Sequence, residues 1–193
     1  MPIAPPTRAR PLLRRPSGLV GVLVAALLLA AAGAVAATRP AAGDAPPTGV
    51  GRPAPPLRGT TLAGTPLDLA ALRGAVVVVD AWAAWCAPCR QELPVLVAAQ
   101  RRLAPRGLRL VGIDVRDGAV QARALLAAAG GDPAASVADP SGVLAAAWDV
   151  RDLPQTVVLD RSGTVRARHL GPVTAAWLDG TVGPLLAELA VAG

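Results

Sequence analysis

The feature that most constrains this chain is a Cys-x-x-Cys pair placed between an apolar run and an amphipathic segment. Cys86 and Cys89 are the only two cysteines among the 193 residues. Residues 75–81 are β-branched or small and apolar apart from Asp80, which predicts a buried strand. Residues 86–103 carry apolar side chains at helical spacing. The pattern therefore predicts a strand that delivers a thiol pair to the start of a helix.

A thiol pair in this position is typical of redox chemistry. Cysteines three residues apart lie on one side of the first helical turn, where they can close a small disulfide ring. Cys86 also lies beside the unpaired N–H groups and the positive dipole end of the helix, which favour the attacking thiolate. Pro88 fits the first turn, where a missing N–H costs nothing. We expect Cys86 to be the exposed nucleophile and Cys89 the shielded resolving thiol.

Two other uses of the cysteine pair are disfavoured. A purely structural disulfide would gain little here, because stabilisation falls as the closed loop becomes shorter. A metal site needs further ligands, and the only histidine, His169, is far away in the sequence. We therefore expect neither a metal nor another cofactor.

The charge distribution argues against nucleic-acid binding. The formal net charge is +6, and all 19 basic residues are arginine. Residues 1–39 hold five arginines and no acid, whereas residues 40–193 hold fourteen arginines and thirteen acids. The main part of the chain is nearly neutral, so no basic face is predicted.

The N-terminal region has the pattern of an export segment. An arginine-rich stretch, residues 1–18, precedes nineteen uncharged residues, 19–37. A helix of that length covers roughly 28 Å at about 1.5 Å per residue, close to the thickness of a bilayer core. The positive-inside rule keeps the arginines cytoplasmic and places the rest outside the cell membrane. The length favours a single-pass anchor, while an A-x-A pattern ending at Ala36 fits a secreted protein with a cleaved signal.

The remaining sequence predicts a linker at 38–50 and one α/β domain at 51–193. Proline, alanine and glycine dominate the linker. Within the domain, we expect a hairpin at 57–61 and 65–69, a strand at 108–115, helices at 119–129 and 141–148, a second hairpin at 155–160 and 164–169, and a final helix at 174–190 interrupted at Gly183-Pro184. Helices alternating with strands and followed by a hairpin predict a mixed sheet.

The order of several motifs resembles a known family. These motifs are Gly51-Arg52-Pro53-Ala54-Pro55, the segment from Leu67 to Gly74, Asp80 to Arg90 with the cysteine pair, Glu92 with Pro94, and Leu153-Pro154-Gln155-Thr156. Together they resemble the thioredoxin-fold proteins, and more narrowly the exported TlpA/ResA/CcmG-type thiol–disulfide oxidoreductases. The resemblance covers roughly residues 51–189. It implies a mixed central sheet flanked by helices.

Further roles combine this resemblance with the residue types. Asp80 at a strand end is either a solvated acid or, if buried, an acid with a raised pKa that accepts the proton of Cys89. Glu92 is either a surface acid paired with Arg90 or Arg102, or a group that tunes the pKa of the thiols. Pro94 inside the helix predicts a kink.

The resemblance also implies a substrate-binding surface. Pro154 is expected to follow a cis peptide bond beside Cys86, which leaves the backbone of Leu153 to pair with substrate. Trp85 is expected to cover the surface at the active site. Trp82, Trp148 and Trp177 are expected to be packing residues, and His169 a surface residue.

The expected function is the reduction of protein disulfides outside the cytoplasm. Ala87-Pro88 between the cysteines lacks the histidine that stabilises the thiolate in strong oxidants of this fold. The resemblance implies apocytochrome c as a substrate and a membrane protein as electron donor. The alternative is an oxidase that forms disulfides in secreted proteins. A thiol peroxidase would need threonine where Ala83 stands, and a Sco-type copper module would need Cys-x-x-x-Cys.

Overall fold

The structure is a computed structural model that describes residues 49–188. The predicted segments 1–18 and 19–37, and the linker as far as residue 48, lie outside the described residues. Within the part that is described, no helix is both long and apolar enough to cross a membrane. The membrane segment and the domain boundaries therefore stay predictions.

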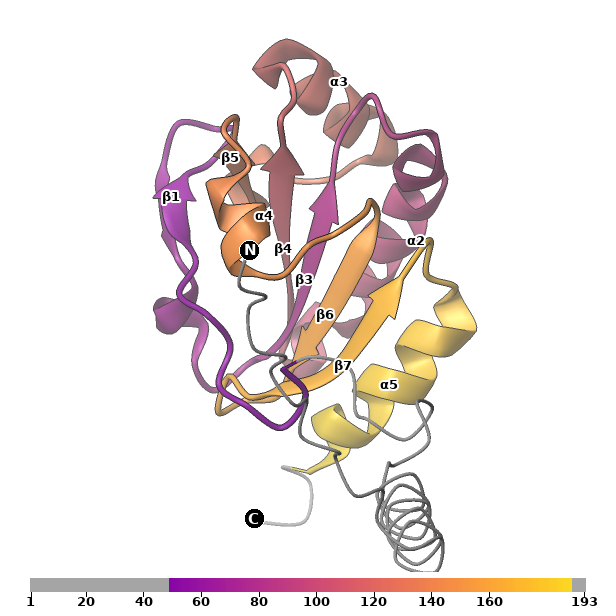
Figure 1. The fold of residues 1–193 in the computed structure, drawn as a ribbon. Coiled ribbons are helices and arrows are strands. Elements are labelled where there is room, and N and C mark those ends of the chain that lie inside the picture. Colours follow the sequence, from indigo (N-terminus) through magenta and orange to yellow (C-terminus); the bar gives the residue numbers. More distant parts are fainter. Residues whose placement is uncertain (1–48, 189–193) are drawn as a thin grey trace, which may run out of the picture. The chain divides into compact units, whose positions relative to one another are not determined.

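A five-stranded mixed sheet forms the centre of the domain, in the order β5-β4-β3-β6-β7 (Figure 1). The central strand β3 (Val76–Trp82) pairs in parallel with β4 (Leu108–Val115) and antiparallel with β6 (Gln155–Leu159). At the edges, β5 (Ser136–Asp139) is parallel to β4, and β7 (Val165–Leu170) is antiparallel to β6. Every residue of β3 is buried, because other elements cover both faces of the sheet.

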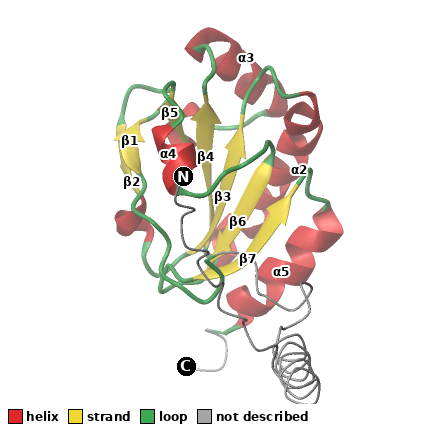
Figure 2. Ribbon diagram, viewed as in Figure 1, coloured by secondary structure: helices red, strands yellow, loops and turns green. Residues whose placement is uncertain are grey.

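The two faces of the sheet are covered by different elements (Figure 2). The helices are α2 (Ala87–Leu103), α3 (Ala119–Ala129), α4 (Val143–Ala147) and α5 (Ala175–Ala187), and the hairpin consists of β1 (Arg58–Thr60) and β2 (Pro66–Asp68). Helices α2 and α5 pack against Val76 and Val78 of β3, and α3 packs beside α2. Helix α4 and the segment around the hairpin pack on the opposite face, against Val77 and Val79.

Short 3₁₀ turns complete the fold. They are η1 (Leu69–Leu72), η2 (Ala104–Arg106) and η3 (Pro133–Ala135). The chain leading to the hairpin is held by the start of β7, since Gly51 N–H donates to the Val165 carbonyl at 2.8 Å. This pairing places the first described residues against the sheet.

Most of the predicted elements are present. The hairpins, β3, β4, α3 and α4 lie within one or two residues of the predicted bounds, and Gly130 ends α3 in the left-handed conformation at φ 70°. The predicted mixed α/β class, a central mixed sheet flanked by helices, is confirmed. Strand β5 was not predicted, because four residues carry too weak a periodic pattern.

The predicted interruption of the last helix is wrong for the described residues. Helix α5 continues through Gly183 and Pro184. Proline removes one backbone hydrogen bond, but buried Val182, Leu185 and Leu186 hold the helix against the sheet. Helix α2 likewise runs through Pro94, and the kink expected there stays a prediction.

Candidate active site

The thiol pair lies where β3 passes into α2. Cys86 is the N-cap residue of α2, and its sulfur accepts the backbone N–H of Cys89 at 3.2 Å. Pro88 occupies the first turn of the helix, as predicted. The two cysteines form a disulfide, with their Cα atoms 5.3 Å apart. Strand β3 therefore delivers Cys86 to the end of the helix at which N–H groups and the dipole favour negative charge.

Cys86 is less exposed than the sequence led us to expect. In this disulfide form Cys86 is 5% exposed and Cys89 is fully buried. Both belong to an apolar cluster that contains Trp82 and Leu93, with Leu153 packed against it. The order of exposure agrees with the prediction, but packing against this cluster leaves only an edge of Cys86 at the surface.

The turn before Cys86 is held by the loop that follows β4. The Ala84 N–H donates to the Asp117 carboxylate, and the indole N–H of Trp85 donates to the Arg116 carbonyl at 3.1 Å. Trp85 is 59% exposed, so its ring lies at the surface beside the thiols, as expected. Sequence analysis missed Arg116 and Asp117, although polar residues directly after a buried strand are a signal of a functional loop.

Asp80 is buried beneath α2, which excludes the solvated strand-end alternative. Its side chain is on the β3 face that carries Val78 and Trp82, because side chains alternate along a strand. Thr156 on β6 donates its hydroxyl to Asp80 Oδ1 at 3.2 Å, and Oδ2 has no protein partner among the described residues. Burial raises the pKa of Asp80 well above its ordinary value, and the nearby Glu92 charge raises it further.

Glu92 is also buried, and the surface alternative for it is wrong. It is 1% exposed and accepts the backbone N–H of Val173 at 2.8 Å. Burial raises the pKa of Glu92 to about 7, although the bond from Val173 lowers it in part. Arg90 instead donates to the Ala84 carbonyl, and Arg102 forms an ion pair with Asp179 at 2.5 Å. Two carboxyl groups therefore lie within the domain on the side of α2.

The Leu153–Pro154 peptide bond is cis, as the resemblance implied. Leu153 packs against the apolar cluster that holds both cysteines. The N–H of Leu153 is not free to pair with a substrate in this form, because it donates to the Asp152 side chain at 2.9 Å. The Pro154 carbonyl accepts the N–H of Gly171 at 2.9 Å, which ties the loop to the end of β7.

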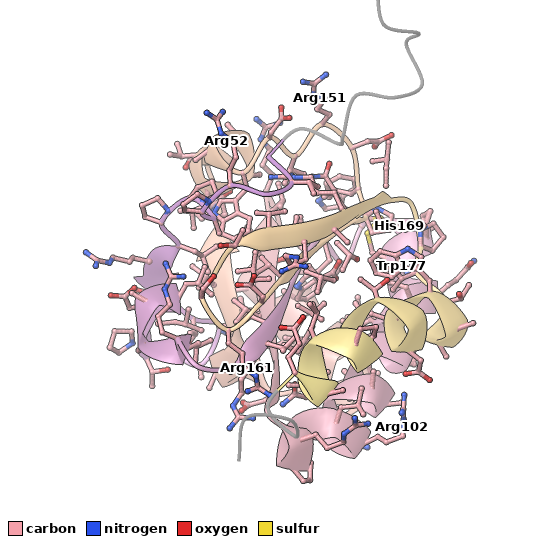
Figure 3. All side chains as sticks on the ribbon, turned by 90° about the horizontal axis from the view of Figure 1, so that it is seen from below. Arg52, Arg102, Arg151, Arg161, His169 and Trp177 are labelled. Atoms are coloured by element: carbon pink, nitrogen blue, oxygen red, sulfur yellow. A yellow bond between two sulfur atoms is a disulfide. The ribbon has the colours of Figure 1, made fainter. Side chains whose placement is uncertain are left out.

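The remaining aromatic residues fall into two groups. Trp82 and Trp148 are 1% exposed, as expected for packing residues. Trp177 is half-buried, and its ring centroid lies 4.8 Å from that of His169 (Figure 3). The sequence suggested a surface residue at His169, but its side chain is only partly exposed, because Trp177 of α5 covers one side of its ring.

A second set of acids was missed by sequence analysis. Asp114 at the end of β4 is 2% exposed and lies near Asp117 and Asp139. Burial raises the pKa of Asp114 to about 7, and the charges of Asp117 and Asp139 add to the shift. Between residues 49 and 188, no group of three His, Cys, Asp or Glu side chains is arranged to hold a metal ion.

Comparisons with known proteins place the chain in a family. The sequence profile of the AhpC/TSA family matches residues 50–168. The thiol:disulfide interchange protein HelX of Rhodobacter capsulatus is 35% identical over 150 residues, which cover 76% of this chain and 83% of HelX. The thiol:disulfide interchange protein DsbE of Vibrio cholerae is 31% identical over 173 residues, which cover 86% of this chain and 92% of DsbE.

Solved structures show the same relationship. A thiol:disulfide interchange protein of the thioredoxin family from Chlorobium tepidum matches with a TM-score of 0.63 and 33% identity, covering 75% of this chain and 99% of that one. A DsbF homologue from Corynebacterium diphtheriae matches with a TM-score of 0.64 and 31% identity, covering 69% and 86%. With a disulfide at the start of α2, this chain belongs to the AhpC/TSA family and is a thioredoxin-fold thiol–disulfide oxidoreductase.

Proposed function

We propose that this protein reduces disulfide bonds of other exported proteins, with Cys86 as the nucleophile and Cys89 as the resolving thiol. The observation that carries the proposal is the position of Cys86 as N-cap of α2, with Cys89 and a buried Asp80 on the inner side. This arrangement favours a thiolate at Cys86, and the buried Asp80 lies on the face of β3 that α2 covers, the helix that carries Cys89.

In the reduced protein, the Cys86 thiolate attacks one sulfur of a substrate disulfide and displaces the other sulfur as a thiolate. The Cys89 thiol then loses its proton to Asp80 and attacks Cys86 in the mixed disulfide. The second substrate sulfur leaves as a thiolate, and both substrate thiolates take protons from solvent. The substrate gains two electrons and becomes a dithiol, while the protein becomes the Cys86–Cys89 disulfide.

Glu92 has a different proposed role from that of Asp80. Both carboxyl groups are buried, and the charge on Glu92 raises the pKa of Asp80. A negative charge on Glu92 therefore favours the protonated form of Asp80. We assign Glu92 to tuning the pKa of the thiol and acid groups around it, rather than to direct proton transfer from Cys89.

The substrate-binding surface is proposed to lie between Trp85 and Leu153. A groove of about 200 Å³ runs between these residues and is lined by Arg116, Val150 and Arg151 among others. Exposed Trp85 supplies apolar area without an ordering cost, because its indole N–H is already bonded to the protein. An extended substrate segment in this groove would bring its disulfide to the exposed edge of Cys86.

The proposed direction of electron flow and the proposed location rest on the sequence. Ala87-Pro88 provides no histidine to stabilise a Cys86 thiolate, and an oxidant depends on such stabilisation. Apocytochrome c is the proposed substrate and a membrane protein the proposed electron donor. Residues 19–37 would anchor the domain on the extracytoplasmic side of the cell membrane.

The test of the catalytic roles is mixed-disulfide trapping in cells that express the full chain. The Cys89→Ser variant should accumulate substrates bound through Cys86, whereas Cys86→Ser should accumulate none. In the reduced protein, alkylation of Cys86 should be faster than that of Cys89. Trapping by Cys86→Ser would reverse the assignment of the two thiols. Equal labelling of both thiols would contradict it.

The test of direction is the reduction potential of the Cys86–Cys89 pair, measured against glutathione. A value near that of thioredoxin, about −270 mV, is expected for a reductant. A value near about −120 mV, as in strong oxidants, would favour the oxidase alternative instead. A reporter fused after Gly193 should be active only outside the cytoplasm, which tests the location separately.

A further inference from the structure

A cavity on the inner side of Asp80 has no role in the exchange reaction described above. Its volume is about 230 Å³, and it lies between the sheet, α2, α3 and η3. The deep end is lined by Asp80, Trp82 and Ser136, which are at most 4% exposed. The outer end is lined by exposed Arg101, Gly130 and Asp132. The cavity therefore connects Asp80 with the surface of the protein, away from Trp85.

Three polar atoms of the residues that line this cavity have no protein partner among the described residues. They are Asp80 Oδ2, the indole nitrogen of Trp82 and Gln100 Oε1. Buried polar atoms are almost always hydrogen-bonded to protein or to ordered water. The wall between these atoms is apolar and is formed by Leu93, Val97, Leu110 and Leu126. An apolar wall does not satisfy an indole donor, an amide acceptor and a carboxyl oxygen, whereas water molecules in a cavity of this size can bond to all three.

The backbone of β4 keeps this space open. Gly112 lines the cavity opposite Asp80, its partner in the β3–β4 register. A Cβ atom at position 112 would lie 2.2 Å from Ser136 Oγ and 2.6 Å from the Trp82 indole nitrogen. Any larger residue would fill the region in which the unpartnered groups meet. The unpartnered polar atoms and the cavity beside them therefore form one site.

We propose that this cavity holds a hydrogen-bonded chain of water molecules through which Asp80 exchanges its proton with solvent, and that Gln100 is a positioning residue for that chain. The inference rests on the proposed role of Asp80 as proton acceptor for Cys89. After Cys89 attacks Cys86, Asp80 carries the proton that Cys89 has lost. Water bound to Asp80 Oδ2 takes this proton and passes it outward past Gln100 to the opening at Arg101, where solvent accepts it. The carboxylate is thereby restored for the next cycle.

The content of the cavity is tested by NMR on the full chain, through transfer of magnetisation between water and the tryptophan indole N–H groups. The Trp82 indole should show a contact with long-lived water, and Trp82→Phe identifies its signal. The Trp148 indole is the internal control, because it donates to the Pro56 carbonyl at 3.3 Å. Absence of a water contact at Trp82 would overturn the proposal, whatever the activity of the protein.

The role of Gln100 is tested by its substitution with leucine, which has a similar size but no acceptor. Gln100→Leu should weaken the water contact at Trp82 and slow resolution of the mixed disulfide about fivefold, the factor for one net hydrogen bond. Attack by Cys86 on substrate should keep its rate. Gln121→Leu on the exposed side of α3 is the matched control and should change neither measurement.

Two variants distinguish a wrong role for Asp80 from a wrong route for its proton. If Asp80→Asn leaves resolution unchanged, the proton-transfer role of Asp80 is wrong, while the water contact at Trp82 still reports what the cavity holds. If Asp80→Asn slows resolution but Gln100→Leu does not, the proton leaves by another route and the proposed water chain is wrong.

Discussion

The two faces of β3 differ in composition and in role: one is entirely apolar, and the other ends in Asp80 and Trp82. On the face toward α4 and the hairpin, Val77, Val79 and Ala81 join an apolar cluster that also contains Trp148. On the face toward α2, Val76 and Val78 are followed by Asp80 and Trp82, which both line a cavity, and Trp82 also packs with the two cysteines. Because side chains alternate along a strand, one short run builds both a dry core and a reactive site. Within β3, the polar side chain thus lies on one face, while the other face is entirely apolar.

The largest expected effect is on the dry face. Trp148→Ala should lower the free energy of unfolding by about 3–5 kcal/mol, because it removes a fully buried ring and leaves a cavity. The reduction potential of Cys86–Cys89 in the folded fraction should stay unchanged. Urea unfolding and redox titration measure the two quantities. A large change in potential would mean that the two faces are not independent.

On the reactive face, Asp80→Asn should act on rate more than on structure. Resolution of the mixed disulfide should slow by one to two orders of magnitude, roughly 10²-fold at most, because asparagine cannot accept the Cys89 proton. The domain should become more stable at neutral pH, since asparagine removes the free-energy cost of burying an acid that is ionised in the unfolded chain. Stopped-flow kinetics and denaturant unfolding check both effects. Unchanged rate and stability together would contradict the buried, proton-accepting role.

Two buried acids, Glu92 and Asp114, should make the free energy of unfolding depend on pH. Burial raises the pKa of both Glu92 and Asp114 to about 7, above their ordinary values of 4.5 and 3.8. Between these limits the folded state holds more protons than the unfolded chain, so the free energy of unfolding falls as pH rises. The slope is at most about 1.4 kcal/mol per pH unit for each group and disappears above their folded pKa.

Denaturant unfolding at a series of pH values from 4 to 9 measures this slope. Glu92→Gln and Asp114→Asn should each flatten it, and the double variant should flatten it further. Surface acids such as Asp179→Asn serve as controls. Stability that increases between pH 5 and pH 7 would contradict the raised pKa values of both groups.

The smallest expected effect is at Thr156, which lies next to Asp80 on β6. Its hydroxyl bond lowers the pKa of Asp80 in part, so Thr156→Val should raise that pKa further. Stability at neutral pH should fall by about 1 kcal/mol, the usual net contribution of one hydrogen bond. The slowing of resolution should be smaller than in Asp80→Asn. Thr156→Ser keeps the hydroxyl and should restore both properties; equal slowing in the serine variant would point to packing instead.

Much of the fold could be predicted because its signals are local. The run of valines in β3, the thiol pair and the glycine after α3 each define their element within a few residues. The interruption expected in α5 failed because burial of one helix face outweighs the local effect of Pro184. Strand β5 was missed because a four-residue edge strand depends on pairing with β4 rather than on its own pattern.

The sequence by itself determined the reaction class, because two cysteines at helical spacing after a buried strand have few other uses. It also identified Asp80, Glu92 and Pro154 as residues of interest. Only the tertiary structure decided that Glu92 is buried and accepts the Val173 N–H, that Asp117 holds the turn before Cys86, and that a cavity reaches Asp80. The reason is physical: spacing along the chain dictates which residues share a helix or a strand, whereas burial and pKa depend on elements brought together from distant parts of the sequence.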